Sequence, residues 1–254
     1  MNKINIGIVG CGFVGGALKR WIEEHNKENI NVFVSDPPKG FNDDLSNVDV
    51  VFMSIHVPTE SDGSQDLSLM KDIIKKLPDV PIFIRTTILP GTSQMLSEQT
   101  NHRVYFMPEF LTERTAYEDF CSQPMIFTAE EELLTKVFAG KRHICMTSLE
   151  AEITKYAHNV FGALKVTYFN GIYELCKSME ANYRKIQEGI LLSGYINSPH
   201  TQVPGPDGKL GYGGKCFPKD VNALTQMCGD RNLKIFDLLK ELRPLNITYR
   251  GEDK

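Results

Sequence analysis

Short apolar runs alternate with amphipathic segments over the first part of the chain. Amphipathic segments predict helices at residues 17–25 and 67–77. Strands that alternate with helices form a parallel sheet with both faces covered, so this part is predicted to be an α/β domain. The runs that predict its strands, rich in Val, Ile and Phe, are residues 4–9, 31–35, 49–55, 81–87, 103–106, 124–128 and 142–146.

The pattern changes near Ser148, which is a suitable N-cap residue for a helix that continues without proline to about Met179. Its apolar positions spread around the helix, which predicts burial on more than one side. The polar tail at 246–254 is expected to fray. Further helices are predicted at 183–193, 218–228 and 233–242. We therefore predict two domains, an α/β domain at 1–147 and an all-helical domain at 148–254, with the long helix connecting them.

A glycine-rich loop joins the first predicted strand to the first predicted helix. In a Rossmann-type domain such a loop gives a tight turn, a close approach to a pyrophosphate and close helix packing. Asp36 ends the next strand, and a carboxylate there accepts a bond from the ribose 2′-hydroxyl, which favours NAD over NADP. The glycine loop of a methyltransferase is the alternative. The residues predicted to line the cofactor are Gly10, Gly12, Phe13, Val14, Gly15 and Asp36.

Composition narrows the class of protein. The chain has 254 residues, 41% of them hydrophobic and 24% charged, which is typical of a folded protein with a core. The net charge of −4 and the lack of a basic block do not indicate a nucleic-acid partner. No apolar run is long enough to span a membrane, and the opening residues do not resemble a signal peptide. The six cysteines form no CxxC pair or zinc-like cluster, so we expect reduced thiols, a cytoplasmic location and no metal.

Three polar residues of the long helix share one face. Glu152, Lys155 and Asn159 are spaced by three and four residues. Lysine and asparagine together supply N–H donors and a positive charge suited to a developing oxyanion. A solvated charged face with an ordinary ion pair is the alternative, and the helix pattern by itself favours it.

A second polar cluster lies in the glycine-rich segment 211–220. Pro218 suits the first turn of a helix, which places Cys216 just ahead of the helix N-terminus. A thiol there has its pKa lowered by the helix dipole and by neighbouring lysines, so it is a better nucleophile. Asp220, one turn further on, is suited to hold a water or accept a proton. A buried structural cysteine beside a flexible loop is the alternative.

These clusters and the glycine loop together resemble one family, the UDP-glucose/GDP-mannose dehydrogenases. The resemblance spans nearly the whole chain, and its motifs come in the order that the family has. The cysteine segment is the most specific of them. The motif segments besides the glycine loop are residues 56–59, 85–92, 108–113, 151–159 and 211–220.

The resemblance implies roles for individual residues. Cys216 would be the nucleophile, and Lys155 and Asn159 would stabilise the oxyanion. Asp220 and Thr87 would position the hydrolytic water. The family oxidises the C6 alcohol of a nucleotide sugar twice with two NAD⁺, through a cysteine thiohemiacetal and a thioester. A thiolate adduct supplies the tetrahedral carbon that the second hydride transfer needs.

The remaining implied contacts concern cofactor and substrate. Glu109 would act as acid/base or water partner, with Glu113 close by. The additional cofactor contacts would be Val57, Pro58, Thr59 and Thr87. The substrate contacts would be Glu109, Phe110, Leu111, Glu113, Lys155, Asn159, Tyr212, Gly213 and His200. His200 belongs to a stiff polar loop that could reach a neighbouring subunit, and a surface histidine is the alternative there.

Family members usually carry a third, C-terminal Rossmann-like domain that helps to hold the nucleotide, so we expect a short form without it. A separate chain could supply that domain, the substrate could be smaller or bound differently, or turnover could be lost. The resemblance also implies a homodimer through the long helix, residues 148–180.

Two other functions remain open. A β-hydroxyacid dehydrogenase pairs a similar domain with helices but oxidises once and needs no cysteine. A cofactor-binding module that needs a separate chain for turnover is not an enzyme on its own.

Overall fold

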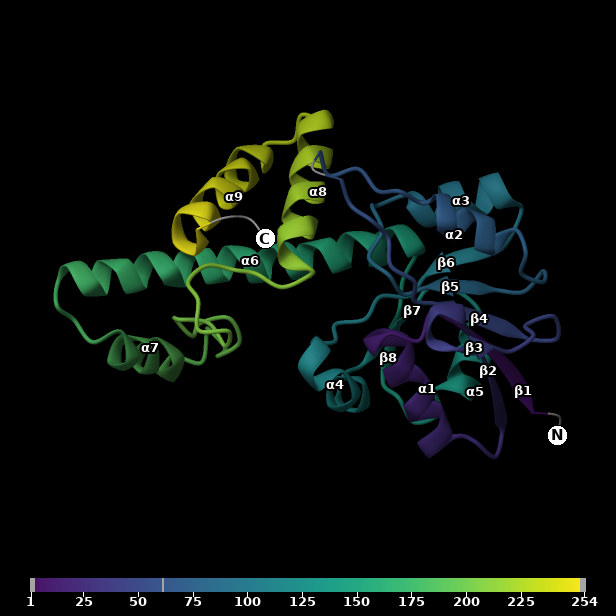
Figure 1. Cartoon of the computed structure of the whole chain (residues 1–254). Coiled ribbons are helices and arrows are strands. Elements are labelled where there is room, and N and C mark those ends of the chain that lie inside the picture. Colours follow the sequence, from purple (N-terminus) through teal and green to yellow (C-terminus); the bar gives the residue numbers. More distant parts are fainter. Residues whose placement is uncertain (1–2, 61, 252–254) are drawn as a thin grey trace. The chain divides into compact units, whose positions relative to one another are not determined.

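The computed structural model describes residues 3–60 and 62–251, and they form two compact units (Figure 1). Unit 1 consists of Met1–Pro58 and Gln65–Lys155, and unit 2 of Thr59–Ser64 and Tyr156–Lys254, as far as these ranges are described. The division falls inside the long helix α6, Ser148–Ser178. None of the helices in the described part of the chain has the length and apolarity that crossing a membrane requires.

Unit 1 is built on a six-stranded sheet with the order β3-β2-β1-β4-β5-β6. All neighbouring strands are parallel except β3, which runs antiparallel to β2. The central strand β4 is buried at every position, as expected for a sheet covered on both faces. The predicted Rossmann-type fold is therefore confirmed. The strands are β1 (Ile4–Val9), β2 (Ile30–Asp36), β3 (Phe41–Asn42), β4 (Val50–Met53), β5 (Ile82–Ile84) and β6 (Val104–Phe106).

Two of the predicted strands do not join this sheet. β7 (Met125–Phe127) and β8 (His143–Cys145) pair with each other in a separate parallel ladder. The apolar pattern identified them as strands but could not assign their partners, because pairing depends on the tertiary fold.

Short helices cover unit 1, and three of them were missed by the apolar pattern. α3, α4 and α5 have seven to nine residues, and a helical period is weakly defined over so few positions, although the equally short α2 was predicted. The helices are α1 (Phe13–His25), α2 (Ser68–Ile74), α3 (Thr92–Thr100), α4 (Ala116–Ser122) and α5 (Glu131–Val137), with 3-10 turns η1 (Pro37–Lys39) and η2 (Glu113–Thr115).

Within its described residues, the regular elements of unit 2 are all helices, as predicted. One face of α6 packs with the later helices around Val160, Val221 and Leu239. Further along α6, Phe169 and Cys176 pack against Tyr183. Its other helices are α7 (Tyr183–Leu192), α8 (Phe217–Asp230) and α9 (Phe236–Arg250).

The prediction of a frayed tail is wrong for residues 246–250. α9 continues through Pro244 to Arg250, and Asn246 within it is 2% exposed. The polar side chains that suggested fraying are engaged with the glycine-rich segment before α8. Residues 252–254 of the predicted tail lie outside the described residues.

Candidate functional site

The glycine loop has the geometry of a phosphate cradle. Gly10 has a φ of +86°, and a Cβ there would lie 2.8 Å from the carbonyl oxygen of Ser54. A Cβ on Gly15 would overlap the carbonyl oxygen of Gly10, so this position requires glycine for close packing. A Cβ on Gly12 would meet the end of the Lys39 side chain at 4.0 Å, an ordinary contact, and as the N-cap of α1 this glycine offers no side chain to cap the helix. The first amides of α1, including those of Phe13 and Val14, are thus suited to bind an anion.

The carboxylate of Asp36 is tied to this loop. Its Oδ2 accepts a hydrogen bond of 2.7 Å from the backbone N–H of Cys11. Lys39 donates to the carbonyl oxygen of Cys11 at 2.7 Å, and its Nζ lies 3.9 Å from Asp36 Oδ2. The predicted ribose-binding carboxylate therefore stands at the glycine loop, as the motif requires. These residues fit a dinucleotide.

The other predicted cofactor contacts are divided between the units. Val57 is buried and Pro58 exposed in unit 1, whereas Thr59 belongs to unit 2. Thr87 is 7% exposed, and its carbonyl oxygen accepts a bond from Gln65.

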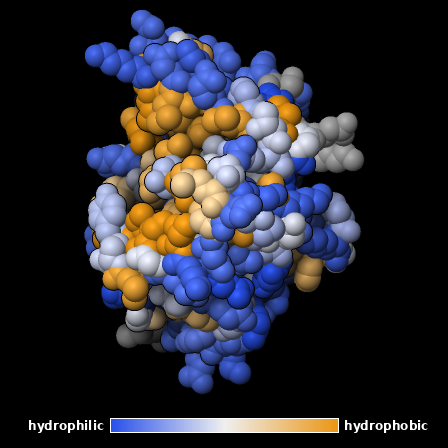
Figure 2. Space-filling view, turned by 90° about the vertical axis from the view of Figure 1, so that its left-hand side faces the viewer, coloured by the Kyte–Doolittle hydropathy of each residue, from blue (hydrophilic) through white to orange (hydrophobic). Residues whose placement is uncertain are grey.

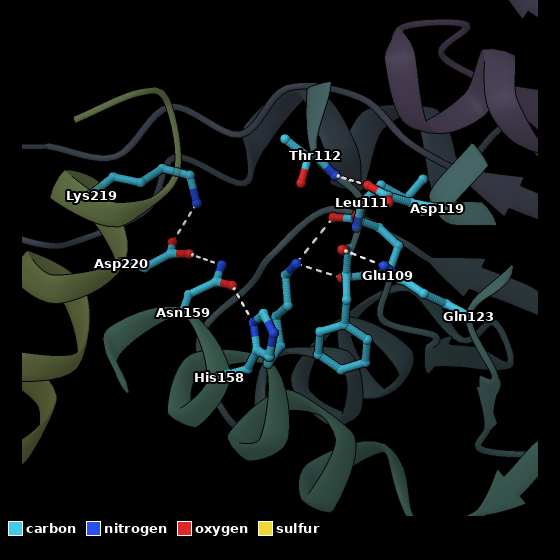
Figure 3. Close-up of polar contacts among 11 residues, drawn as sticks. Glu109, Leu111, Thr112, Asp119, Gln123, His158, Asn159, Lys219 and Asp220 are labelled. Atoms are coloured by element: carbon cyan, nitrogen blue, oxygen red, sulfur yellow. Dashed lines mark hydrogen bonds and ion pairs between the residues drawn. The ribbon is translucent and has the colours of Figure 1, made fainter. Parts of the chain in front are cut away.

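Glu109 and Lys155 form a buried ion pair in unit 1. Lys155 Nζ lies 3.1 Å from Glu109 Oε1 and also donates to the carbonyl oxygen of Glu109. Glu109 Oε2 accepts the N–H of Leu111 at 2.6 Å, a contact visible in Figure 3. The ring of Phe110 lies 5.3 Å from the Lys155 ammonium. The structure thus brings together four of the predicted residues, while Glu113 lies in η2 and is exposed.

A hollow borders Glu109 within unit 1. It has about 260 Å³ of empty space, counting its open mouth. Its one buried cation, Arg85, is 1% exposed, and its Nε and Nη1 have no hydrogen-bond partner among the described residues. Burial lowers the pKa of Arg85 to about 10, against the opposing charge of Glu109. Arg85 remains a cation at neutral pH, and no sequence pattern indicates a role for it.

Asn159 and Asp220 form the buried polar contact of unit 2. Asn159 Nδ2 donates to Asp220 Oδ2 at 2.6 Å, and both side chains are at most 4% exposed (Figure 3). Lys219 donates to the other oxygen of Asp220. His158 Nδ1 lies 3.0 Å from Asn159 Oδ1. The carboxylate is therefore fixed from two sides, and a charged hydrogen bond of this kind is stronger than a neutral one.

Cys216 lies at the N-cap position of α8, as predicted from Pro218. Its side chain is half-buried, so it is neither sealed in the core nor fully exposed. The carbonyl oxygen of Cys216 accepts the N–H of Asp220 at 3.0 Å in the first turn. The thiol and the buried carboxylate are thus separated by one helical turn at the positive end of α8.

The glycine-rich segment before Cys216 is held by α9. Asn246 accepts the N–H of Tyr212 at 2.7 Å and donates to its carbonyl oxygen at 3.0 Å. Arg250 donates to the carbonyl oxygens of Leu210 and Gly211, both at 3.2 Å. A side chain at Gly213 would overlap the Arg250 guanidinium. The sequence did not predict these contacts, because Asn246 and Arg250 are distant in the chain from the glycine-rich segment and were assigned to the tail.

His200 lies against the helix that carries the thiol. Its ring centroid is 5.2 Å from that of Phe217, edge to face, although the residue is exposed overall. Partial desolvation, followed by the charges of Lys165 and His158, lowers the pKa of the imidazole. His200 therefore favours the neutral form at pH 7.

Glu152 does not belong to a solvated face. It is 0% exposed and accepts the N–H groups of Gly91 at 2.6 Å and Ser93 at 2.9 Å. Burial raises the pKa of this carboxyl group, opposed by the bonds from Ser93 and Gly91. Since Lys155 and Asn159 are also buried, the alternative of a charged solvated surface is wrong.

Sequence comparison relates the chain to one family of proteins. A model of the central domain of the UDP-glucose/GDP-mannose dehydrogenase family matches residues 149–248. The UDP-glucose 6-dehydrogenase of Rickettsia typhi is 30% identical over 258 residues, which cover 92% of this chain and 56% of the relative. The match places residues 149–248 in the UDP-glucose/GDP-mannose dehydrogenase family. The enzyme of the same name from Rickettsia conorii is 29% identical and is covered to 51%, so the chain spans about half the length of these relatives.

Solved structures of family members share the fold. The UDP-glucose dehydrogenase of Pyrobaculum islandicum superposes with a TM-score of 0.80 at 22% identity, covering 97% of this chain and 68% of that one. A GDP-mannose dehydrogenase from Pseudomonas aeruginosa gives a TM-score of 0.61 at 22% identity and covers 96% of this chain and 68% of that one. The family model spans α6 to α9, which include Lys155, Asn159 and Cys216.

Proposed function

We propose that the chain is an NAD-dependent dehydrogenase that oxidises the C6 alcohol of a nucleotide sugar, such as UDP-glucose, to a carboxylate. The observation that carries the proposal is the position of Cys216 at the N-cap of α8, one turn before a buried carboxylate, Asp220, which Asn159 holds. A half-buried thiol at the positive end of a helix is suited to nucleophilic attack.

Cofactor binding is assigned to unit 1. The uncapped amides of α1 would hold the pyrophosphate beside Gly12, and Asp36 would accept the ribose 2′-hydroxyl. NAD⁺ supplies the hydride acceptor for both oxidations. Because Asp36 already accepts the N–H of Cys11, its second oxygen is the one left to recognise the ribose.

The chain's own residues then carry the covalent chemistry. The Cys216 thiolate adds to the aldehyde carbon formed in the first oxidation, and the thiohemiacetal becomes a thioester in the second. Lys155 and Asn159, one turn apart on α6, would donate to the substrate oxygen as charge develops on it. Water then adds to the thioester, Asp220 or Glu109 takes its proton, and the thiol leaves to give the acid. One substrate and one water consume two NAD⁺.

The test is an NADH assay over a panel of nucleotide sugars. We expect two NADH per substrate for the wild type and loss of net oxidation in Cys216→Ser, whereas Cys121→Ser, at an exposed cysteine of α4, should retain turnover. Asp220→Asn should slow thioester hydrolysis by about 10²–10⁴-fold, so that mass spectrometry detects an acyl adduct on Cys216. One NADH per substrate, insensitive to thiol alkylation, would instead favour a β-hydroxyacid-type dehydrogenase. Binding of NAD without turnover on any sugar would contradict the proposal for this chain by itself.

The proposal includes a homodimer through the long helix. An apolar stripe follows one face of α6 and remains exposed in the single chain. Figure 2 is viewed from the side on which α6 ends and α7 lies in Figure 1, nearly along α6, and it shows apolar side chains gathered between polar ones on that side of the molecule. A second copy would cover this stripe. The residues of this stripe in unit 2, with their exposed fractions, are Phe161 (64%), Tyr168 (59%), Leu175 (53%) and Met179 (70%).

Sedimentation equilibrium tests the dimer. The double substitution Phe161→Glu with Tyr168→Glu should yield monomers, while Lys177→Glu, at an exposed polar position of the same helix, should leave the assembly intact. Equal molecular mass for both variants would exclude this face as the interface. A cytoplasmic location is part of the same proposal, since a reducing compartment keeps the Cys216 thiol available.

A further inference from the structure

Three metal-ligating side chains converge in unit 1. Glu131, His143 and Cys145 each offer one ligand atom, and these atoms all lie within 4.8 Å of one another. They come from the first residue of α5 and from both ends of β8. The sequence did not indicate this cluster, because Glu131 lies twelve residues before His143 and joins it only through the fold.

The fold explains why the ligand atoms meet. His143 and Cys145 stand two residues apart on a strand, so their side chains point to the same face. The ring of His143 stacks on Phe127 of the paired strand, with centroids 4.2 Å apart and an interplanar angle of 17°. Stacking limits rotation of the imidazole. Its Nε2 lies 3.3 Å from Glu131 Oε1.

This geometry is close to a tetrahedral coordination shell. Metal–ligand distances of about 2.0–2.3 Å place neighbouring ligands roughly 3.3–3.8 Å apart. The nitrogen and the carboxylate oxygen already have this spacing at 3.3 Å. The Cys145 sulfur, on an exposed residue, lies within 4.8 Å of the other two ligand atoms, so side-chain movement of roughly 1 Å would bring it into the third of the four positions.

We propose that Glu131, His143 and Cys145 form a binding site for a zinc-type divalent cation, with solvent in the fourth position. A thiolate and an imidazole favour zinc or cobalt over magnesium or calcium, which prefer oxygen ligands. Binding replaces the thiol proton of Cys145 by the cation and releases that proton to solvent. The site clamps α5 to β8 and is independent of the proposed dehydrogenase function.

Cobalt titration of the reduced protein tests the proposal. We expect one Co²⁺ per chain, with a thiolate-to-cobalt charge-transfer band that Zn²⁺ abolishes. Cys145→Ser should remove the band, and His143→Ala should weaken binding by more than about tenfold. Cys121→Ser and Cys216→Ser, at half-buried or exposed cysteines outside the cluster, should retain the band.

All three ligand side chains are partly or fully exposed, so the variants should keep the wild-type circular dichroism. A band that persists in Cys145→Ser would overturn the proposal, because another thiolate would then be the ligand. Equal affinity of His143→Ala and the wild type, or no stoichiometric binding at all, would overturn it as well. Dehydrogenase turnover enters none of these readouts, so failure here leaves the proposed enzyme function unaffected.

Discussion

Replacing Glu152 by glutamine should destabilise unit 1 in a way that depends on pH. This carboxylate is 0% exposed and accepts two N–H groups, from Gly91 and Ser93, at the start of α3. α3 has no side-chain cap of its own, so Glu152 performs that function from α6. The glutamine amide keeps one oxygen, and its NH₂ group would face an N–H donor.

The magnitude follows from the lost interactions. One charge-assisted hydrogen bond contributes about 1.5–3 kcal/mol, and the interaction with the helix dipole contributes roughly 0.3–1 kcal/mol. The neutral glutamine does not bear the cost of burying a charge, which offsets part of the lost stability. The raised pKa of Glu152 indicates that the wild type bears this cost. We expect a net loss of about 1–3 kcal/mol at pH 7, or roughly 2–10 °C in Tm for a domain of this size.

The sign of the pH dependence is fixed by the direction of the pKa shift. The pKa of Glu152 is raised in the folded state, so its contribution is fully present below the ordinary value of about 4.5 and is lost as pH rises through the folded value. Relative to Glu152→Gln, the wild type should therefore gain stability as pH falls from 7 towards 4.5. The difference between the two proteins removes the effect of all other titrating groups.

Fluorescence of Trp21 is a suitable probe, because it is the chain's single tryptophan and is 4% exposed in the core of unit 1. Glu98→Gln, at an exposed carboxylate of α3, is the matched control and should change stability by less than about 0.5 kcal/mol. Equal stability of Glu152→Gln and the wild type at pH 7 would refute the capping argument. A difference in the free energy of unfolding between the wild type and Glu152→Gln that narrows on acidification would refute the predicted direction of the pH dependence.

Three further outcomes follow from the glycine loop and from α9. Gly15→Ala should abolish NAD binding measured by calorimetry, because its Cβ overlaps a carbonyl oxygen of the loop, while Gly16→Ala, with nothing within 4 Å, should bind normally and stabilise α1 by about 0.5–1 kcal/mol. Asp36→Ser should narrow the preference for NAD over NADP in the same titration, since the carboxylate that repels a 2′-phosphate is gone. Asn246→Ala removes two hydrogen bonds and should cost about 1–3 kcal/mol in unit 2 and speed amide exchange in the segment 210–216; Thr248→Ala, exposed on the same helix, should do neither.

Much of the fold, and the local position of several candidate site residues, could be predicted from the sequence. The β-branched runs predicted all of the parallel strands, and the glycine spacing predicted the loop before α1, because both depend on local backbone preferences. Pro218 likewise predicted that Cys216 lies just ahead of a helix, since proline suits a first turn. Family motifs then named Lys155, Asn159 and Asp220.

Only the tertiary structure decided how these residues are paired and buried. The helix pattern could not distinguish a solvated charged face from the buried bonds of Glu152, because periodicity gives a face but not what covers it. The sequence predicted that Asn246 and Arg250 belong to a frayed polar tail. In the structure, their long-range hydrogen bonds hold the segment before Cys216. The cluster of Glu131, His143 and Cys145 arises in the same way. Neighbouring residues determine the local conformational preferences of the backbone. The contacts named here join residues distant in the chain, so they exist only once the chain has folded.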